Sequence, residues 1–98
     1  RELTPNQLRE ALRGHWPKDA KISYDSALLV KSSTGPYYID MAPEELSNRT
    51  IGIHKKLKEN GLSEKARTDY QYRLDAIAAI LKAKANLAAQ PEQEELSL

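Results

Sequence analysis

The sequence predicts a single α+β domain, mostly helical, in which a short antiparallel β-hairpin precedes a long C-terminal antiparallel helical hairpin. Three observations predict this fold class. A helix-start signal opens the chain, a central stretch is rich in strand-forming residues, and residues 43–60 and 63–89 place apolar side chains at helical spacing. The predicted element order is α-β-β-α-α, with residues 1–90 as one domain and residues 91–98 as an acidic, flexible tail.

The first helix has local signals at both ends. Thr4 suits the N-cap, Pro5 suits the first helical position, and Gln7 stands three residues after the cap, which completes a capping box. Gly14 is the predicted end, in a left-handed conformation. A helix of about ten residues is marginal in isolation. We therefore expect Trp16, the only tryptophan, to fill the core beside it.

The central stretch favours strands. Residues 27–30 form a continuous apolar run, residues 32–36 have the composition of a loop, and residues 37–39 are β-formers. These features predict a β-hairpin over about residues 27–40, with residues 21–24 as an optional third strand. Because two strands alone are marginal in water, helices must cover one face of this hairpin.

Two longer helices follow and form the predicted helical hairpin. The first begins at Pro43 and stops at Gly61, and the second begins after a Ser63 cap and ends near Ala89. At about 1.5 Å per residue the second is roughly 40 Å long. Their short connection makes them antiparallel neighbours. Gly52 lies inside the first helix, where glycine costs about 1 kcal/mol relative to alanine, and it marks a kink or a close helix contact.

The composition indicates one globular core. Hydrophobic residues make up 40% and charged residues 30%, no apolar run approaches the roughly 20 residues of a bilayer span, and cysteine is absent. Disulfides and cysteine-based metal sites are therefore excluded, and we expect a cytoplasmic protein held together by packing. The predicted core residues are Leu8, Leu12, Trp16, Leu29, Ile39, Leu46, Ile53, Leu57, Leu74, Ile77 and Leu81.

The net charge of +1 hides an uneven distribution. Residues 1–48 carry six basic and seven acidic side chains, residues 49–89 carry nine basic and four acidic, and residues 90–98 carry three acidic and no basic ones. A basic helical half followed by an acidic tail indicates an anionic partner.

No pattern predicts catalysis, a metal site or a cofactor. His15 and His54 are far apart and lack the spacing of metal ligands. Ser32, Ser33 and Thr34 stand beside Lys31 in a loop, but without the glycine-flanked serine of a nucleophile elbow or the glycines of a phosphate-binding loop. We therefore expect a protein that is not an enzyme.

One constellation of basic and aromatic residues remains. The turn of the helical hairpin should bring the end of one helix to the start of the next, which predicts a cationic tip beside an exposed tyrosine. Such a tip could hold phosphates while the tyrosine stacks on a base, although lysines in a last helical turn also simply complement the helix dipole. The candidate binding residues are Lys55, Lys56, Lys58, Lys65, Arg67, Tyr72 and Arg73.

The far half of the last helix is rich in alanine, at Ala76, Ala78, Ala79, Ala83, Ala85, Ala88 and Ala89. Small residues let another helix approach closely, and alanine also simply favours helix. Two interpretations therefore stay open, a docking face for a partner helix or second copy and a solvated helix. The length of the helix favours a partner.

The leading hypothesis is a non-catalytic protein-interaction or regulatory module. It would bind and modulate a larger protein, such as a nucleic-acid-processing machine, through the helical hairpin, and a size of this kind is common among phage and plasmid accessory proteins. The alternative is a domain that binds nucleic acid directly with the basic tip. A homodimer through the last helix is compatible with both hypotheses, a membrane partner is not expected, and no motif is specific enough to name a family.

Overall fold

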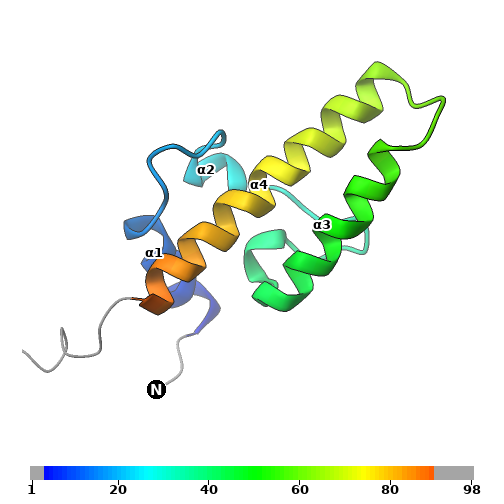
Figure 1. Ribbon diagram of the computed structural model, residues 1–98. Helices are drawn as coiled ribbons and strands as arrows, with labels where there is room; N and C mark the ends of the chain where they lie inside the picture. The colour runs from blue at the N-terminus through cyan, green and yellow to red at the C-terminus, as the bar shows by residue number, and fades with distance from the viewer. Residues whose placement is uncertain (1–3, 90–98) are drawn as a thin grey trace, which may run out of the picture.

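The computed structural model describes residues 4–89 (Figure 1). The elements in chain order are α1 (Pro5–Gly14), α2 (Tyr24–Ala27), the 3-10 helix η1 (Tyr38–Asp40), α3 (Pro43–Leu57) and α4 (Glu64–Ala89). Helices α1, η1 and α3 all pack against α4, and Figure 1 shows α3 beside its N-terminal half and α1 beside its C-terminal end. The acidic tail predicted for residues 91–98 lies outside the described residues.

The predicted β-hairpin over residues 27–40 is wrong, as is the third strand at residues 21–24. Residues 4–89 contain no strand, and an isolated antiparallel bridge between Lys31 and Tyr37 is what remains of the expected pairing. The α+β class and the α-β-β-α-α order are therefore replaced by an all-helical order of α1, α2, η1, α3 and α4.

The first predicted strand begins at the last residue of a helical turn instead, because α2 ends at Ala27 and residues 28–29 continue as a turn. Ser23 caps α2, because its Oγ accepts a hydrogen bond from the amide of Ser26 at 3.2 Å. Ala27 and Val30 are buried, whereas Leu29 is 75% exposed. Burial at a spacing of three residues is helical, while a half-buried strand buries alternate residues. The prediction of Leu29 as a core residue is therefore also wrong.

The second predicted strand is a 3-10 turn with both neighbouring side chains inside. Tyr38 and Ile39 are 2% and 1% exposed. Successive side chains of a strand point to opposite faces, so a strand covered on one face could not bury both. Asp40 at the end of η1 forms an ion pair with Arg9, which ties the turn to α1.

The predicted start of the first helix is confirmed. Thr4 Oγ1 accepts from the Gln7 amide at 3.1 Å, and Gln7 Oε1 accepts from the Thr4 amide at 2.9 Å, so the capping box is complete. The helix ends at Gly14, but not in the predicted left-handed conformation. Among the described residues, Gly35 and Gly61 are the positions with positive φ.

The predicted helical hairpin is present, and α3 and α4 run antiparallel in Figure 1. α3 begins at Pro43 as predicted and ends at Leu57. The connection contains Gly61 with φ +86°, a conformation that favours glycine. Ser63 Oγ then accepts from the amide of Ala66 at 3.1 Å, which confirms the predicted cap of α4.

α4 is buried along much of its length by the rest of the chain. Beyond α3, the segment after α1 lies against it, because Asn86 Nδ2 on α4 donates to the His15 carbonyl at 3.1 Å. Within that segment, Trp16 Nε1 donates to the Ile22 carbonyl at 3.0 Å. No helix within residues 4–89 is both long and apolar enough to cross a membrane. The buried residues of α4 are Leu74, Ala76, Ile77, Ala79, Ile80 and Ala83.

Candidate functional site

The end of the helical hairpin gathers most of the predicted binding residues. Arg67 Nη1 donates to the carbonyl of Leu57 at 3.1 Å, which joins the last turn of α3 to the first turn of α4. The exposed cations at this end are Lys55, Lys56, Lys58, Lys65 and Arg67.

Two of these cations also have local partners. Arg67 is held by the Leu57 carbonyl, and Lys56 Nζ lies 3.7 Å from Glu59 Oε2 in an exposed pair of the kind that contributes little to stability. Within residues 4–89, no ion pair includes Lys55, Lys58 or Lys65. Arg67 is likewise in none of these ion pairs, so the hairpin end keeps the positive charges of Arg67 and the three lysines without an acidic partner among the described residues.

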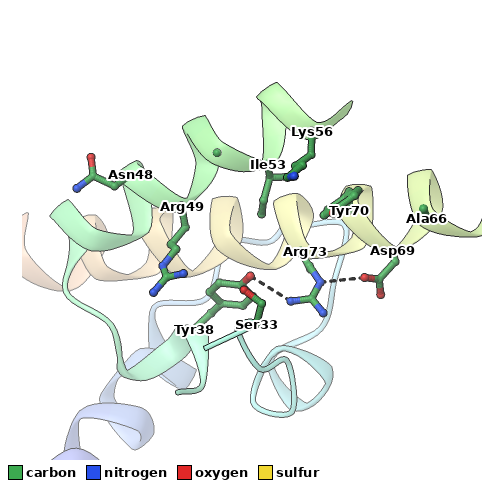
Figure 2. A pocket seen from close by; sticks show the side chains of 11 residues that line it. Ser33, Tyr38, Asn48, Arg49, Ile53, Lys56, Ala66, Asp69, Tyr70 and Arg73 are labelled. Carbon is green, nitrogen blue, oxygen red and sulfur yellow. Dashed lines mark hydrogen bonds and ion pairs between the residues drawn. The ribbon is translucent and has the colours of Figure 1, made fainter. Parts of the chain in front are cut away.

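Arg73 lies apart from that end and joins α4 to the segment before η1. Its Nε donates to Asp69 Oδ2 at 2.9 Å, and its Nη1 donates to the Lys31 carbonyl at 2.9 Å and lies 3.3 Å from Tyr38 Oη (Figure 2). The hydrogen bonds to Asp69 and Tyr38 raise the pKa of Arg73 above its ordinary value. Arg73, a predicted binding residue, is therefore held by hydrogen bonds within the chain.

Tyr72 is exposed, as predicted, and has an apolar neighbour from another segment. Its side chain is 45% exposed and Leu29 is 75% exposed. Both line one depression of about 320 Å³ on the surface, together with Val30 and Arg73. We call this depression the Leu29–Tyr72 hollow. Sequence reasoning missed Leu29 because it was assigned to the core of a strand.

A larger depression lies between the two long helices and is named here the α3–α4 groove. It has a volume of about 530 Å³. Its apolar part includes Gly52, Ile53, Ala66 and Tyr70, and Figure 2 shows charged side chains reaching it from both helices. The remaining lining residues are Ser33, Tyr38, Asn48, Arg49, Lys56, Asp69 and Arg73.

Gly52 faces this groove from the middle of α3. A Cβ atom built at Gly52 would meet nothing within 4 Å, and its φ is not positive. The close helix contact considered from the sequence is therefore wrong, because no packed neighbour requires a glycine. Its cost of about 1 kcal/mol relative to alanine is not offset by packing within the described chain.

Arg49 stands on the α3 side of the groove. Its Nη2 donates to Thr34 Oγ1 at 3.0 Å and lies 3.6 Å from Glu45 Oε2. Figure 2 places Arg49 and Arg73 on either side of Tyr38 and Ser33. Among the groove residues, Arg49, Lys56 and Arg73 are cationic and Asp69 is anionic, so the lining carries a charge of +2.

The groove was missed from the sequence for a definite reason. Arg49, Gly52 and Lys56 recur at the three- and four-residue spacing of one helix face, which is a usable signal. Ser33 and Tyr38 had been placed in a β-hairpin, so nothing indicated that they would meet this face.

The alanine-rich half of α4 is largely used by the fold. Ala76, Ala79 and Ala83 are at most 4% exposed and belong to the core. α1 and η1 pack on the same helix, so its length does not by itself require a partner. Exposed alanines on α4 are Ala78, Ala85, Ala88 and Ala89.

The residues weighed for catalysis do not form a cluster. Across residues 4–89, no three histidine, cysteine or acidic side chains come close enough to hold a metal ion. Ser32 Oγ lies 3.1 Å from Thr34 Oγ1, and the Lys31 ammonium lies 5.4 Å from the centre of the Tyr37 ring. These groups are therefore engaged in local contacts within the loop.

Comparisons with models of protein families, with curated proteins and with solved structures found no significant match to this chain. The functional argument therefore rests on the geometry and charge of its own surfaces.

Proposed function

We propose that this chain is a non-catalytic interaction module that binds and modulates a larger protein through the α3–α4 helical hairpin. The observation that carries the proposal is the adjacency of Leu29 and Tyr72, which are 75% and 45% exposed and line the same hollow. Single exposed apolar residues are ordinary on protein surfaces, but paired ones in a concave site with a charged rim are typical of binding surfaces. Tyrosine is also enriched among residues that dominate binding energy.

The surroundings of the Leu29–Tyr72 hollow support the same proposal. Arg73 and Asp69 line this hollow and also the α3–α4 groove, so the two depressions adjoin at these residues. A partner that covers both would bury apolar groups at the centre and meet charges at the rim, which is the usual anatomy of a protein interface.

The experiment uses the full chain as bait and compares single variants. Tyr72→Ala and Leu29→Ser remove the exposed anchors, while Ile51→Ser is the matched control, because Ile51 is 59% exposed and lines neither depression. Lysate treated with nuclease should yield a stoichiometric protein partner with the wild type and with Ile51→Ser. We expect Tyr72→Ala to weaken capture at least tenfold, which corresponds to about 1.4 kcal/mol.

Two results would overturn the proposal. One is the absence of any stoichiometric partner, and the other is a partner retained equally by Tyr72→Ala, Leu29→Ser and the control.

The basic end of the hairpin suits a cytoplasmic partner that handles nucleic acid. Phage and plasmid accessory proteins regulate partners of this kind.

A second candidate function is direct binding of nucleic acid. It is favoured by Lys55, Lys58 and Lys65, whose charges have no ion-pair partner among the described residues. Phosphate contacts make the logarithm of the binding constant fall linearly with the logarithm of salt concentration. Replacing the three lysines with alanine should lower that slope by about 2 to 3, whereas Tyr72→Ala should leave it unchanged. Unshifted DNA and RNA probes at low salt would reject this candidate.

A further inference from the structure

We propose that the α3–α4 groove receives an apolar side chain from an acidic segment of the partner protein. This inference rests on the proposed function and names the chemistry of what is bound. It begins from Gly52, which weakens α3 without serving any close contact in the chain. What Gly52 does in the structure is leave the α3 wall of the groove without a side chain.

The floor of the groove suits an apolar group. Ile53 is 8% exposed, and Ala66 and Tyr70 are half-buried beside it. The volume of about 530 Å³ lies within the range of about 300–1,000 Å³ typical of ligand sites. A leucine-sized side chain entering over Gly52 would therefore exchange water for contacts with apolar walls.

The length of the groove favours a chain segment as its occupant. Lining residues on α3 run from Asn48 to Lys56, about 12 Å at the rise of a helix. An extended chain covers about 3.3 Å per residue, so three to four residues of a partner fit along this wall.

The rim specifies acidic side chains. Arg49, Lys56 and Arg73 surround the floor, opposed by Asp69. Each of these cations already has a carboxylate beside it: Arg73 donates to Asp69 at 2.9 Å, Arg49 lies 3.6 Å from Glu45, and Lys56 lies 3.7 Å from Glu59. A guanidinium has five donors in a planar fork that matches a carboxylate. Among the described residues, Arg49 Nε and Nη1 and Arg73 Nη2 have no hydrogen-bond partner, so donors remain for carboxylates of a partner.

The test titrates the full ¹⁵N-labelled chain with short synthetic peptides and follows the amide signal of Gly52. The probe contains two leucines separated by aspartate and glutamate. One control peptide replaces the acids with asparagine and glutamine, and another replaces the leucines with alanine. We expect a saturable shift at Gly52 with a dissociation constant of about 1 mM or tighter for the probe, and at least tenfold weaker binding for each control.

Variants of the groove give an independent readout. Gly52→Ala and Gly52→Leu place increasing bulk in the opening, and since a helix tolerates both residues better than glycine, we expect them to fold and to weaken peptide binding progressively. The shift in Gly52→Leu is followed at neighbouring Ile53. Ile51→Ser, on the same helix but outside the groove, should bind like the wild type.

The outcomes separate this inference from the proposed function. The inference is overturned if the acidic probe causes no shift up to about 1 mM, or if Gly52→Leu binds it unchanged. It is also overturned if adenosine monophosphate or a short single-stranded DNA shifts Gly52 and the peptide does not. If a captured partner depends on Tyr72 but binds Gly52→Leu normally, the groove inference is contradicted and the proposed function as an interaction module is kept. If the peptide binds the groove but no partner is captured, the groove inference is kept and the proposed function is contradicted.

Discussion

The guanidinium of Arg73 donates a hydrogen bond to the backbone carbonyl of Lys31 at 2.9 Å, across 42 positions of sequence. The same Nη1 lies 3.3 Å from the hydroxyl of Tyr38, and Nε reaches Asp69. One side chain of α4 thus holds both sides of the loop that the bridge at Lys31 closes. This loop forms one wall of the α3–α4 groove through Ser33 and Tyr38.

Arg73→Ala should therefore destabilise the fold, although the residue lies on a helix surface. The change removes three hydrogen bonds from the charged guanidinium, a kind that contributes about 1.5–3 kcal/mol when shielded from water and less than about 1 kcal/mol in an exposed pair such as that with Asp69. We expect a loss of about 1–3 kcal/mol in the free energy of unfolding, measured by urea denaturation. Lys65→Ala should change it by about 0.5 kcal/mol or less, because Lys65 is exposed and has no ion pair among the described residues. Equal midpoints for the two variants would contradict this reading of Arg73.

Two glycines should respond to alanine in opposite directions. Gly52→Ala should raise stability by about 0.5–1 kcal/mol, because a Cβ meets nothing within 4 Å and the backbone is helical. Gly61→Ala should lower it by about 1 kcal/mol, because its φ of +86° is unfavourable for a side chain. Thermal unfolding of both variants and the wild type measures the signs, and a stabilised Gly61→Ala would refute the turn geometry.

The helix starts could be predicted because their signals are local. The Thr4–Gln7 box, the start at Pro43 and the Ser63 cap each involve residues within a few positions of one another. The middle of the chain could not be predicted in this way. Tyr38 becomes a buried 3-10 residue through contacts that include Arg73, and no local preference of a Tyr-Tyr-Ile run contains that information.

The candidate site could also be predicted only where its signals are local in the sequence. The lysines around the hairpin turn could be placed together because a short connection forces neighbouring helix ends into proximity. The groove is formed by three segments that are distant in the sequence, so no single stretch indicates it. In the sequence alone, Arg49 is indistinguishable from a solvated helix residue. Its role follows from the loop that Thr34 brings against it, 15 positions away.

The helical turn at α2 makes a prediction that a strand would not. Leu29→Ser should change stability by about 0.5 kcal/mol or less, because Leu29 is 75% exposed. Val30→Ala should cost about 2 kcal/mol, because Val30 is 8% exposed and belongs to the core. Chemical denaturation of the two variants compares them directly. A larger loss of unfolding free energy at Leu29 than at Val30 would contradict the helical turn and support the strand arrangement.

Tyr24 makes stability depend on pH above its ordinary pKa. Its ring is 8% exposed, packs edge-on to Trp16 with centroids 5.5 Å apart, and its hydroxyl donates to the carbonyl of Arg9. Burial is the main cause that raises the pKa of Tyr24 above the ordinary value of about 10, with Glu10 adding to it.

Between that ordinary value and the raised pKa, the unfolded chain has lost the tyrosine proton and the folded chain keeps it. Because the folded state then binds more protons, the contribution of Tyr24 to the free energy of unfolding must fall as pH rises above about 10. Burial lowers the pKa of Lys84, despite the opposing effect of Asp40, so Lys84 contributes the opposite slope between that lowered pKa and its ordinary value of 10.5. Tyr24→Phe isolates the tyrosine, because it should lose about 0.5–1.5 kcal/mol at pH 7 with its hydrogen bond and then show a shallower decline above pH 10. Urea denaturation of both proteins from pH 8 to pH 11 measures the difference, and parallel curves would show that the Tyr24 hydroxyl is not held protonated by its surroundings.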